Sequence, residues 1–173
     1  MKNYAFVDGQ NLYMNTKANN WNVDLKKFCK YLREKYNVDK AYYFLGAIDD
    51  SQQELYENVQ TAGFILVFRE HSQSMLGKKK GNVDTDIVFS VMQKIADGDK
   101  FDKVVLVSGD GDYFKMVKYL VDRDRFCKLL TPNRHSTSSL YRVITPMFVS
   151  FLDDSGVKRK IEYKKINKKA GSS

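Results

Sequence analysis

The residues of this chain best suited to chemistry are aspartates that follow apolar runs or begin a helical segment. Carboxylates held close together repel one another and raise each other's pKa unless a cation lies between them. Hard divalent ions such as Mg²⁺ and Mn²⁺ prefer oxygen ligands, and they assist the hydrolysis of phosphodiesters. The pattern therefore predicts a metal-assisted reaction, with these candidate ligands: Asp8, Asp84, Asp86, Asp110 and Asp112.

Each aspartate also has a purely structural interpretation. Asp8 precedes a glycine and could open a turn, while Asp84, Asp86 or Asp112 could cap a helix. Three separate segments carry these acids, however, and in each segment they stand where a strand ends or a helix begins. This shared placement favours a common site over a set of unrelated caps and turns.

The elements that must position these acids alternate along the chain between apolar, β-rich runs and longer segments of helical period. This alternation predicts a three-layer α/β/α domain with a central, mostly parallel sheet. The expected strands are 3–7, 40–45, 64–68, 103–107, 126–130 and 147–152. The expected helices are 12–17, 25–36, 51–62, 83–96, 113–121 and 138–142, the third starting at a capping box of Ser51 and Glu54.

The predicted sheet brings the acids to one edge. In open α/β sheets, ligands bind beyond the carboxyl ends of the strands, at the point where the strand order reverses. Asp8 ends the first strand, and Asp110 and Asp112 follow the buried run 104–107. We therefore expect these side chains to meet at one rim of the sheet.

The overall charge is compatible with a polyanionic partner. The net charge is +8 and the pI is 9.3, and lysines are concentrated in 78–80 and 158–169. Nucleic acid is the usual partner of such a protein, although solvated lysine runs also serve solubility alone. Residues 69–82 are expected to form a mobile loop. We expect one domain over 1–154, followed by a basic, flexible tail over 155–173.

The chain is expected to be cytoplasmic and to have no contact with membrane. Its apolar runs are too short to span a bilayer, and its first residues lack the pattern of a signal peptide. Cys29 and Cys127 lie in separate apolar segments and are expected to be buried thiols. Together with His71 and His135 they do not have the spacing of a zinc site.

Three motifs resemble those of the NYN domain family, LabA-like members included, which belongs to the PIN-like nuclease group. They are Tyr4–Leu12, Lys80–Asp84 and Val107–Phe114, and they occur in the expected order and spacing over roughly residues 1–152. The resemblance implies a Rossmannoid sheet of the PIN-like type and cleavage that depends on Mg²⁺ or Mn²⁺, usually of RNA. It implies that Asp8, Asp84, Asp110 and Asp112 are the metal-binding and catalytic acids.

The resemblance also assigns two polar residues and shows one departure. Asn11 matches the polar residue near the first acid, and Ser108 matches a small residue that assists at the substrate. Many family members carry another acid about two turns into the helix after Asp84, where this chain has 89–91, Phe-Ser-Val. Asp86 is the candidate to replace this acid as a metal ligand, although its side chain faces elsewhere on an ideal helix.

The predicted function is that of a metal-dependent endoribonuclease using one or two divalent ions. In-line attack of water on the scissile phosphate would leave a 5′-phosphate and a 3′-hydroxyl. The substrate would be held by Ser108, Lys78, Lys79, Lys80 and Arg134, and bases could stack on Tyr13, Trp21 or Tyr113.

Several alternatives stay open. The main one is a non-catalytic PIN-like module that binds RNA or a protein. The reason for considering it is the missing helical acid. A haloacid-type phosphatase is less consistent with the sequence, since it needs a second aspartate where Gln10 stands, and a phosphate-binding Gly-Lys-Ser/Thr loop is absent. RNA against DNA, endonuclease against exonuclease, and monomer against homodimer are not decided by the residues.

Overall fold

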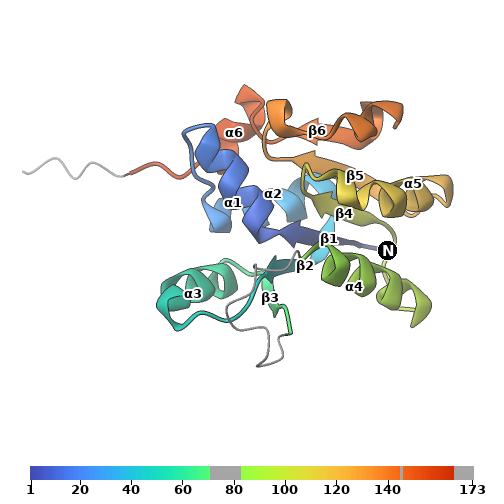
Figure 1. Ribbon diagram of the computed structural model, residues 1–173, viewed down its shortest axis with the longest axis horizontal. Coiled ribbons are helices and arrows are strands. Elements are labelled where there is room, and N and C mark those ends of the chain that lie inside the picture. The colour runs from blue at the N-terminus through green and yellow to red at the C-terminus, as the bar shows by residue number, and fades with distance from the viewer. Residues whose placement is uncertain (71–82, 145, 166–173) are drawn as a thin grey trace, which may run out of the picture.

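A parallel sheet of six strands forms the centre of the protein, described here in a computed structural model (Figure 1). The structure describes residues 1–70, 83–144 and 146–165. The strands are β1 (Asn3–Asp8), β2 (Val38–Leu45), β3 (Ile65–Phe68), β4 (Val104–Val107), β5 (Phe126–Thr131) and β6 (Val149–Phe151). Every predicted strand is present, with ends shifted by a few residues, and the predicted α/β class is confirmed.

The strand order is β3-β2-β1-β4-β5-β6. The chain therefore first builds outward from β1 to β3 and then returns to the other side of β1 with β4. Within the pair of β1 and β4, Val7 lies opposite Val107. The carboxyl ends of these two strands thus flank the point at which the direction of strand addition reverses, which is where open α/β sheets bind ligands.

In the described residues, six α-helices cover the sheet. They are α1 (Gly9–Ala18), α2 (Leu25–Tyr36), α3 (Gln53–Thr61), α4 (Asp84–Ala96), α5 (Phe114–Asp122) and α6 (Ser155–Ile161). Short 3₁₀ turns are η1 (Asp50–Gln52), η3 (Gly111–Tyr113), η4 (Arg134–Ser136), η5 (Ser139–Val143) and η6 (Pro146–Phe148). The helix predicted over 138–142 is therefore a 3₁₀ turn.

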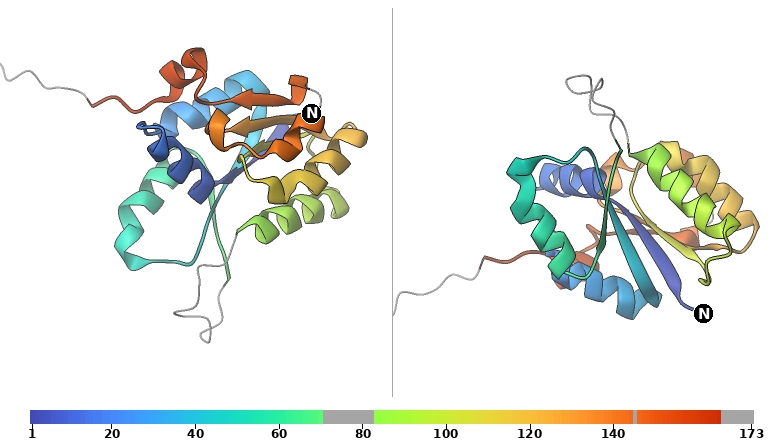
Figure 2. Two further views of the ribbon diagram at one scale, coloured as in Figure 1. Left: turned by 45° about the horizontal axis from the view of Figure 1, so that its top comes forward. Right: turned by 90° about the horizontal axis from the view of Figure 1, so that it is seen from below.

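The two faces of the sheet carry separate hydrophobic cores because side chains alternate along each strand. On one face Phe6 and Leu106 pack with α4, α5 and η5. On the other face Val7 and Val107 pack with α1, α2, α3 and α6. Figure 2 shows α4 and α5 on one side of the strands and α1, α2 and α3 on the other.

Aspartates cap the first two helices, and this explains where these helices begin. The Asp8 side chain accepts a hydrogen bond from the backbone N–H of Asn11, so α1 starts at Gly9 and not at the predicted Leu12. Asp24 caps α2 in the same way and fixes its predicted start at Leu25.

The capping box predicted for Ser51 and Glu54 is wrong. Asp49 caps the 3₁₀ turn η1, and its carboxylate accepts hydrogen bonds from the N–H and the hydroxyl of Ser51 at 3.0 and 2.7 Å. The α3 helix begins only after this turn, without a side-chain cap. A stronger acceptor two residues upstream therefore engages the serine that the prediction had assigned to Glu54.

The predicted boundary at residue 154 is too early. Residues 155–161 form α6, which packs against α2, and Ile161 is fully buried. The N–H of Asp24 donates to the carbonyl of Ile161 at 2.8 Å, and Val23 forms an isolated bridge with Glu162. The segment expected to be a flexible tail thus begins as part of the domain.

In the described part of the chain, none of the helices has the length and apolar character that a membrane span requires.

Candidate active site

The site is built around Asp8, the last residue of β1. Asp8 is only 5% exposed, and both of its carboxylate oxygens accept hydrogen bonds. Oδ1 accepts from the N–H of Asn11 at 3.0 Å, and Oδ2 accepts from the hydroxyl of Tyr113 at 2.9 Å. These two bonds fix the orientation of the carboxylate, while a second lone pair on each oxygen still faces its surroundings.

The electrostatic state of Asp8 reflects its burial and its acidic neighbours. Burial raises the pKa of Asp8 above its ordinary value, because removal from water disfavours the charged form. The hydrogen bonds from Asn11 and Tyr113 oppose this effect, whereas the negative charges of Asp110 and Asp84 add to it. Asp8 therefore lies within electrostatic reach of acids from two other segments.

The loop after β4 is ordered by a chain of hydrogen bonds. The N–H of Asp110 donates to the hydroxyl of Ser108 at 3.1 Å, and the N–H of Asp112 donates to Oδ1 of Asp110 at 3.0 Å. The N–H of Gly109 donates to Oδ1 of Asn11 at 3.0 Å, which ties this loop to α1. The Tyr141 hydroxyl donates to the carbonyl of Asp110. The loop is thus held from three sides.

Asp84 and Asp112 complete the cluster. Asp84 is the first residue of α4, where the exposed backbone N–H groups favour a negative charge. The pKa of Asp112 is raised, first by the negative charge of Asp110 and then by a hydrogen bond and charge repulsion from Asp84. Oδ1 of Asp84 is buried without a hydrogen-bond partner. An oxygen that has lost water and has no donor is suited to a cation.

These four aspartates are the only predicted ligands whose charges act on one another in this way. Their oxygens are of the kind that Mg²⁺ and Mn²⁺ prefer, and the buried Oδ1 of Asp84 supports that fit. Among the described residues, however, no three carboxylate, imidazole or thiolate groups lie close enough to hold one ion. Ion binding would therefore require the less restrained carboxylates to turn toward Asp8.

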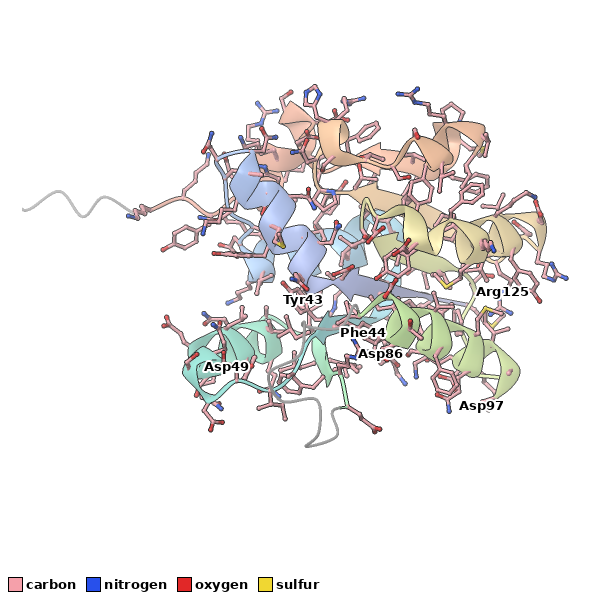
Figure 3. All side chains as sticks on the ribbon, in the orientation of Figure 1. Tyr43, Phe44, Asp49, Asp86, Asp97 and Arg125 are labelled. Atoms are coloured by element: carbon pink, nitrogen blue, oxygen red, sulfur yellow. The ribbon has the colours of Figure 1, made fainter. Side chains whose placement is uncertain are left out.

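Asp86 lies apart from this cluster. Its Oδ2 is 3.9 Å from Nε of Arg69, so its charge is matched by an arginine from the segment after β3. Figure 3 places Asp86 at the beginning of α4. It does not affect the pKa of Asp8 or Asp112, in contrast to Asp84. The structure thus does not bring Asp86 to the position of the missing helical acid, where Phe89 is 65% exposed.

The residues predicted to bind substrate differ in how the structure places them. Ser108 is fully buried and serves the loop, so it presents no surface to a substrate. Arg134 lies with its guanidinium 3.8 Å from the ring centroid of Phe151 and forms an ion pair with Asp154, so much of its charge is already matched. Residues 78–80, the three predicted lysines, lie outside the described residues.

Of the three aromatic residues predicted to stack on bases, one is available. Tyr13 is 55% exposed on α1, whereas Trp21 and Tyr113 are buried. Tyr113 instead points its hydroxyl at Asp8, and Tyr141 holds the loop at Asp110. The sequence carried one signal for Tyr113, its position directly after Asp112. It carried none for Tyr141, which is distant in the chain.

Comparison with known proteins supports the resemblance to the NYN domain family. A sequence model of the NYN domain matches residues 4–152 of the chain. The protein "Low amplitude and bright protein LabA" of Synechococcus elongatus is 23% identical over 124 residues, which cover 66% of this chain and 65% of LabA. The chain therefore spans 65% of the length of this curated relative.

A solved structure shares the fold. A crystal structure of a protein of unknown function from Vibrio parahaemolyticus superposes with a TM-score of 0.71 at 24% identity, over 94% of this chain and 96% of that chain. The sequence model covers most of the chain and includes every aspartate of the cluster. The chain therefore belongs to the NYN domain family.

Proposed function

We propose that this protein is a cytoplasmic, metal-dependent nuclease that hydrolyses phosphodiester bonds in RNA. The observation that carries the proposal is the convergence of Asp8, Asp84, Asp110 and Asp112 at the reversal point of the sheet. Membership of the NYN family, which belongs to the PIN-like nuclease group, supports the same class of reaction. A net charge of +8 favours a polyanionic substrate.

The four aspartates would hold one or two divalent ions. A bound Mg²⁺ or Mn²⁺ supplies a Lewis acid for the scissile phosphate and lowers the pKa of water. Asp8 would be the fixed member, because Asn11 and Tyr113 restrain both of its oxygens. Asp110 is restrained through its loop, and the buried Oδ1 of Asp84 would gain a partner.

Asn11 acts as a positioning residue in this scheme. Its backbone N–H binds Asp8, and its side-chain carbonyl accepts from Gly109 in the loop that carries Asp110. A single residue therefore links the carboxyl end of β1 to the loop after β4. This is a different role from that of a direct catalytic group.

The test is cleavage of labelled RNA in the presence of Mn²⁺. Wild-type protein is expected to cut the RNA and to leave 5′-phosphate ends. Asp8→Asn and Asp110→Asn are expected to lose roughly 100-fold or more in rate while keeping the wild-type circular dichroism spectrum. Undiminished cleavage by both variants would overturn the proposal.

A non-catalytic binding module is the second candidate. It is favoured by the spacing of the acids, since no three potential ligands among the described residues are within reach of one ion, and by Phe89 where many relatives carry an acid. Calorimetric titration with Mn²⁺ separates the two candidates. The nuclease binds Mn²⁺ and loses affinity in Asp84→Asn, whereas a module that only binds RNA takes up RNA without Mn²⁺ and does not cut it.

A further inference from the structure

A groove of about 740 Å³ lies on the opposite side of α1 from Asn11 and the loop after β4. Its walls come from α1, the segment that leads into α2, and α3, and Tyr163, which follows α6, also lines it. The residues that matter for its chemistry are Tyr13, Asn22, Lys26, Asn58 and Tyr163. The groove combines aromatic rings, amides and a lysine, and the proposed cleavage reaction uses none of them.

Two exposed aromatic rings line this groove. Tyr13 is 55% exposed and Tyr163 is 57% exposed, although tyrosine rings of this size usually bury most of their surface. Each ring is anchored. The Nζ of Lys17 lies 3.3 Å from the Tyr13 hydroxyl, and the backbone N–H of Tyr163 donates to the carbonyl of Asn22 at 2.8 Å. The rings are therefore presented to solvent from fixed backbone positions.

The charge of the groove favours an anion. The acid among its lining residues is Asp24, and its carboxylate caps α2 and pairs with Lys27 at 3.9 Å. Lys26, which also lines the groove, forms no ion pair within the described part of the chain. Lys17 stands over the Tyr13 ring at 5.4 Å from its centroid. Cations beside exposed rings are the combination with which proteins hold single-stranded nucleic acid.

The floor of the groove lies close to the start of α1. Its floor includes Tyr43, whose ring packs so closely under Gly9 that a Cβ at Gly9 would lie 2.4 Å from it. Gly9 directly follows Asp8. Tyr13 stands five residues after Asp8 on α1, which is about 7.5 Å along a helix axis. The groove is therefore a separate surface near the proposed cleavage site, on the other side of α1.

We propose that this groove binds unpaired bases of a single-stranded nucleic acid, which stack on Tyr13 and Tyr163. In a duplex the base faces are covered by neighbouring bases, so they are not available to these rings. The substrate class is therefore a single strand. That the bound strand is also the substrate rests on the proposed nuclease function, whereas the binding itself requires neither metal nor cleavage.

The test is the affinity for a short, labelled, mixed-sequence oligonucleotide, measured by fluorescence anisotropy in EDTA. Tyr13→Ala and Tyr163→Ala are each expected to weaken binding of single-stranded RNA by roughly fivefold, and the double variant by roughly 25-fold. The double variant Tyr13→Phe/Tyr163→Phe keeps both rings and is expected to bind as the wild type does. Tyr119→Ala, which removes an exposed ring on α5, is the matched control and is expected to have no effect.

Three results would overturn the inference: wild-type affinity in the double alanine variant, equal affinity for duplex and single strand, or no binding of single strands by the wild type. The first of these is also the outcome if the groove takes a protein segment. Single-stranded DNA in a parallel titration shows whether the groove discriminates the sugar. Thermal melting of each variant confirms that it is folded, and the phenylalanine pair excludes a general loss of packing.

The two proposals fail separately. If the wild type does not cut RNA but binds it through these rings, the groove stands and the nuclease proposal falls. If RNA is cut, and the double alanine variant cuts single strands with unchanged KM and kcat, the groove falls and the nuclease stands.

Discussion

The hydroxyl of Tyr113 donates a hydrogen bond to Oδ2 of Asp8 at 2.9 Å, between two side chains that are both buried. The two residues are 105 positions apart in the sequence. Burial raises the pKa of Tyr113, and the charge of Asp8 and this hydrogen bond raise it further, so the tyrosine remains a neutral donor. The bond joins the carboxyl end of β1 to the loop that supplies Asp110 and Asp112.

Tyr113→Phe removes this hydrogen bond and retains the aromatic ring in the core. We expect a loss of roughly 1–3 kcal/mol in the free energy of unfolding, because a charged, buried acceptor loses its donor. We also expect a lower cleavage rate, since Asp8 keeps only the restraint from Asn11. Denaturant unfolding and the Mn²⁺-dependent rate are the measurements. Tyr119→Phe, at an exposed position, is the control and should change neither.

Two substitutions of Asn11 separate the effect of its hydrogen bond on stability from the effect of an added charge. Asn11→Ala leaves the buried N–H of Gly109 without an acceptor and should cost roughly 1–3 kcal/mol of stability. Asn11→Asp keeps an acceptor but adds a negative charge beside Asp8 and Asp110, so its fold should be retained better in high salt than in low salt. Thermal melting at two salt concentrations measures both effects. Equal stability of the alanine variant and the wild type would show that the bond to Gly109 is dispensable.

The sequence was sufficient to predict the fold class and the location of the aspartate cluster. Strand runs such as 104–107 are apolar throughout because both faces of a parallel sheet are covered, and acids placed directly after such runs must reach one edge. The direction in which a side chain points within that edge depends on contacts between distant segments. The burial of Ser108 and Tyr113 was not predicted for that reason.

The extent of the domain was also beyond the sequence pattern. Residues 155–161 contain three basic residues in their last turn, which resembles a solvated tail. The single apolar side chain of Ile161 is nevertheless fully buried, because α6 packs against α2 and its end bonds to Asp24. Periodicity over so short a segment is too weak a signal to reveal such packing.

Ile161→Ala is therefore expected to destabilise the protein by roughly 2–4 kcal/mol, the usual cost of removing a large buried side chain. The neighbouring Lys160→Ala changes an exposed side chain and should alter stability by no more than about 0.5 kcal/mol. Urea unfolding of both variants tests this. Equal midpoints would show that α6 does not contribute to the domain.

The mutual repulsion of the aspartates predicts how stability depends on pH and metal. The raised pKa of Asp112 means that the folded state binds this proton more tightly than the unfolded chain does. Its unfavourable contribution is therefore absent below the ordinary value of 3.8 and grows as pH rises through the folded-state pKa. In EDTA near neutral pH, Asp112→Asn should melt at a higher temperature than the wild type.

The same variant should lose this advantage in two conditions. Well below pH 3.8 the carboxyl of Asp112 is protonated in both the folded and the unfolded state, and the two melting temperatures should converge. With saturating Mn²⁺ the wild type should gain more stability than Asp112→Asn, since the ion binds the folded state. Asp122→Asn removes an acid paired with Lys118 and is the control. A wild type that is more stable than Asp112→Asn in EDTA at neutral pH would contradict the repulsion.

The central claim is that the aspartates acting on Asp8 form the catalytic metal site, and two residues of α4 test it most directly. Asp84 belongs to the cluster, whereas Asp86 is paired with Arg69. The measurement is the Mn²⁺-dependent rate of RNA cleavage by Asp84→Asn and Asp86→Asn side by side. We predict a loss of roughly 100-fold or more in the first variant and a rate close to wild type in the second. Wild-type cleavage by Asp84→Asn, or an equal loss in both variants, would contradict the claim.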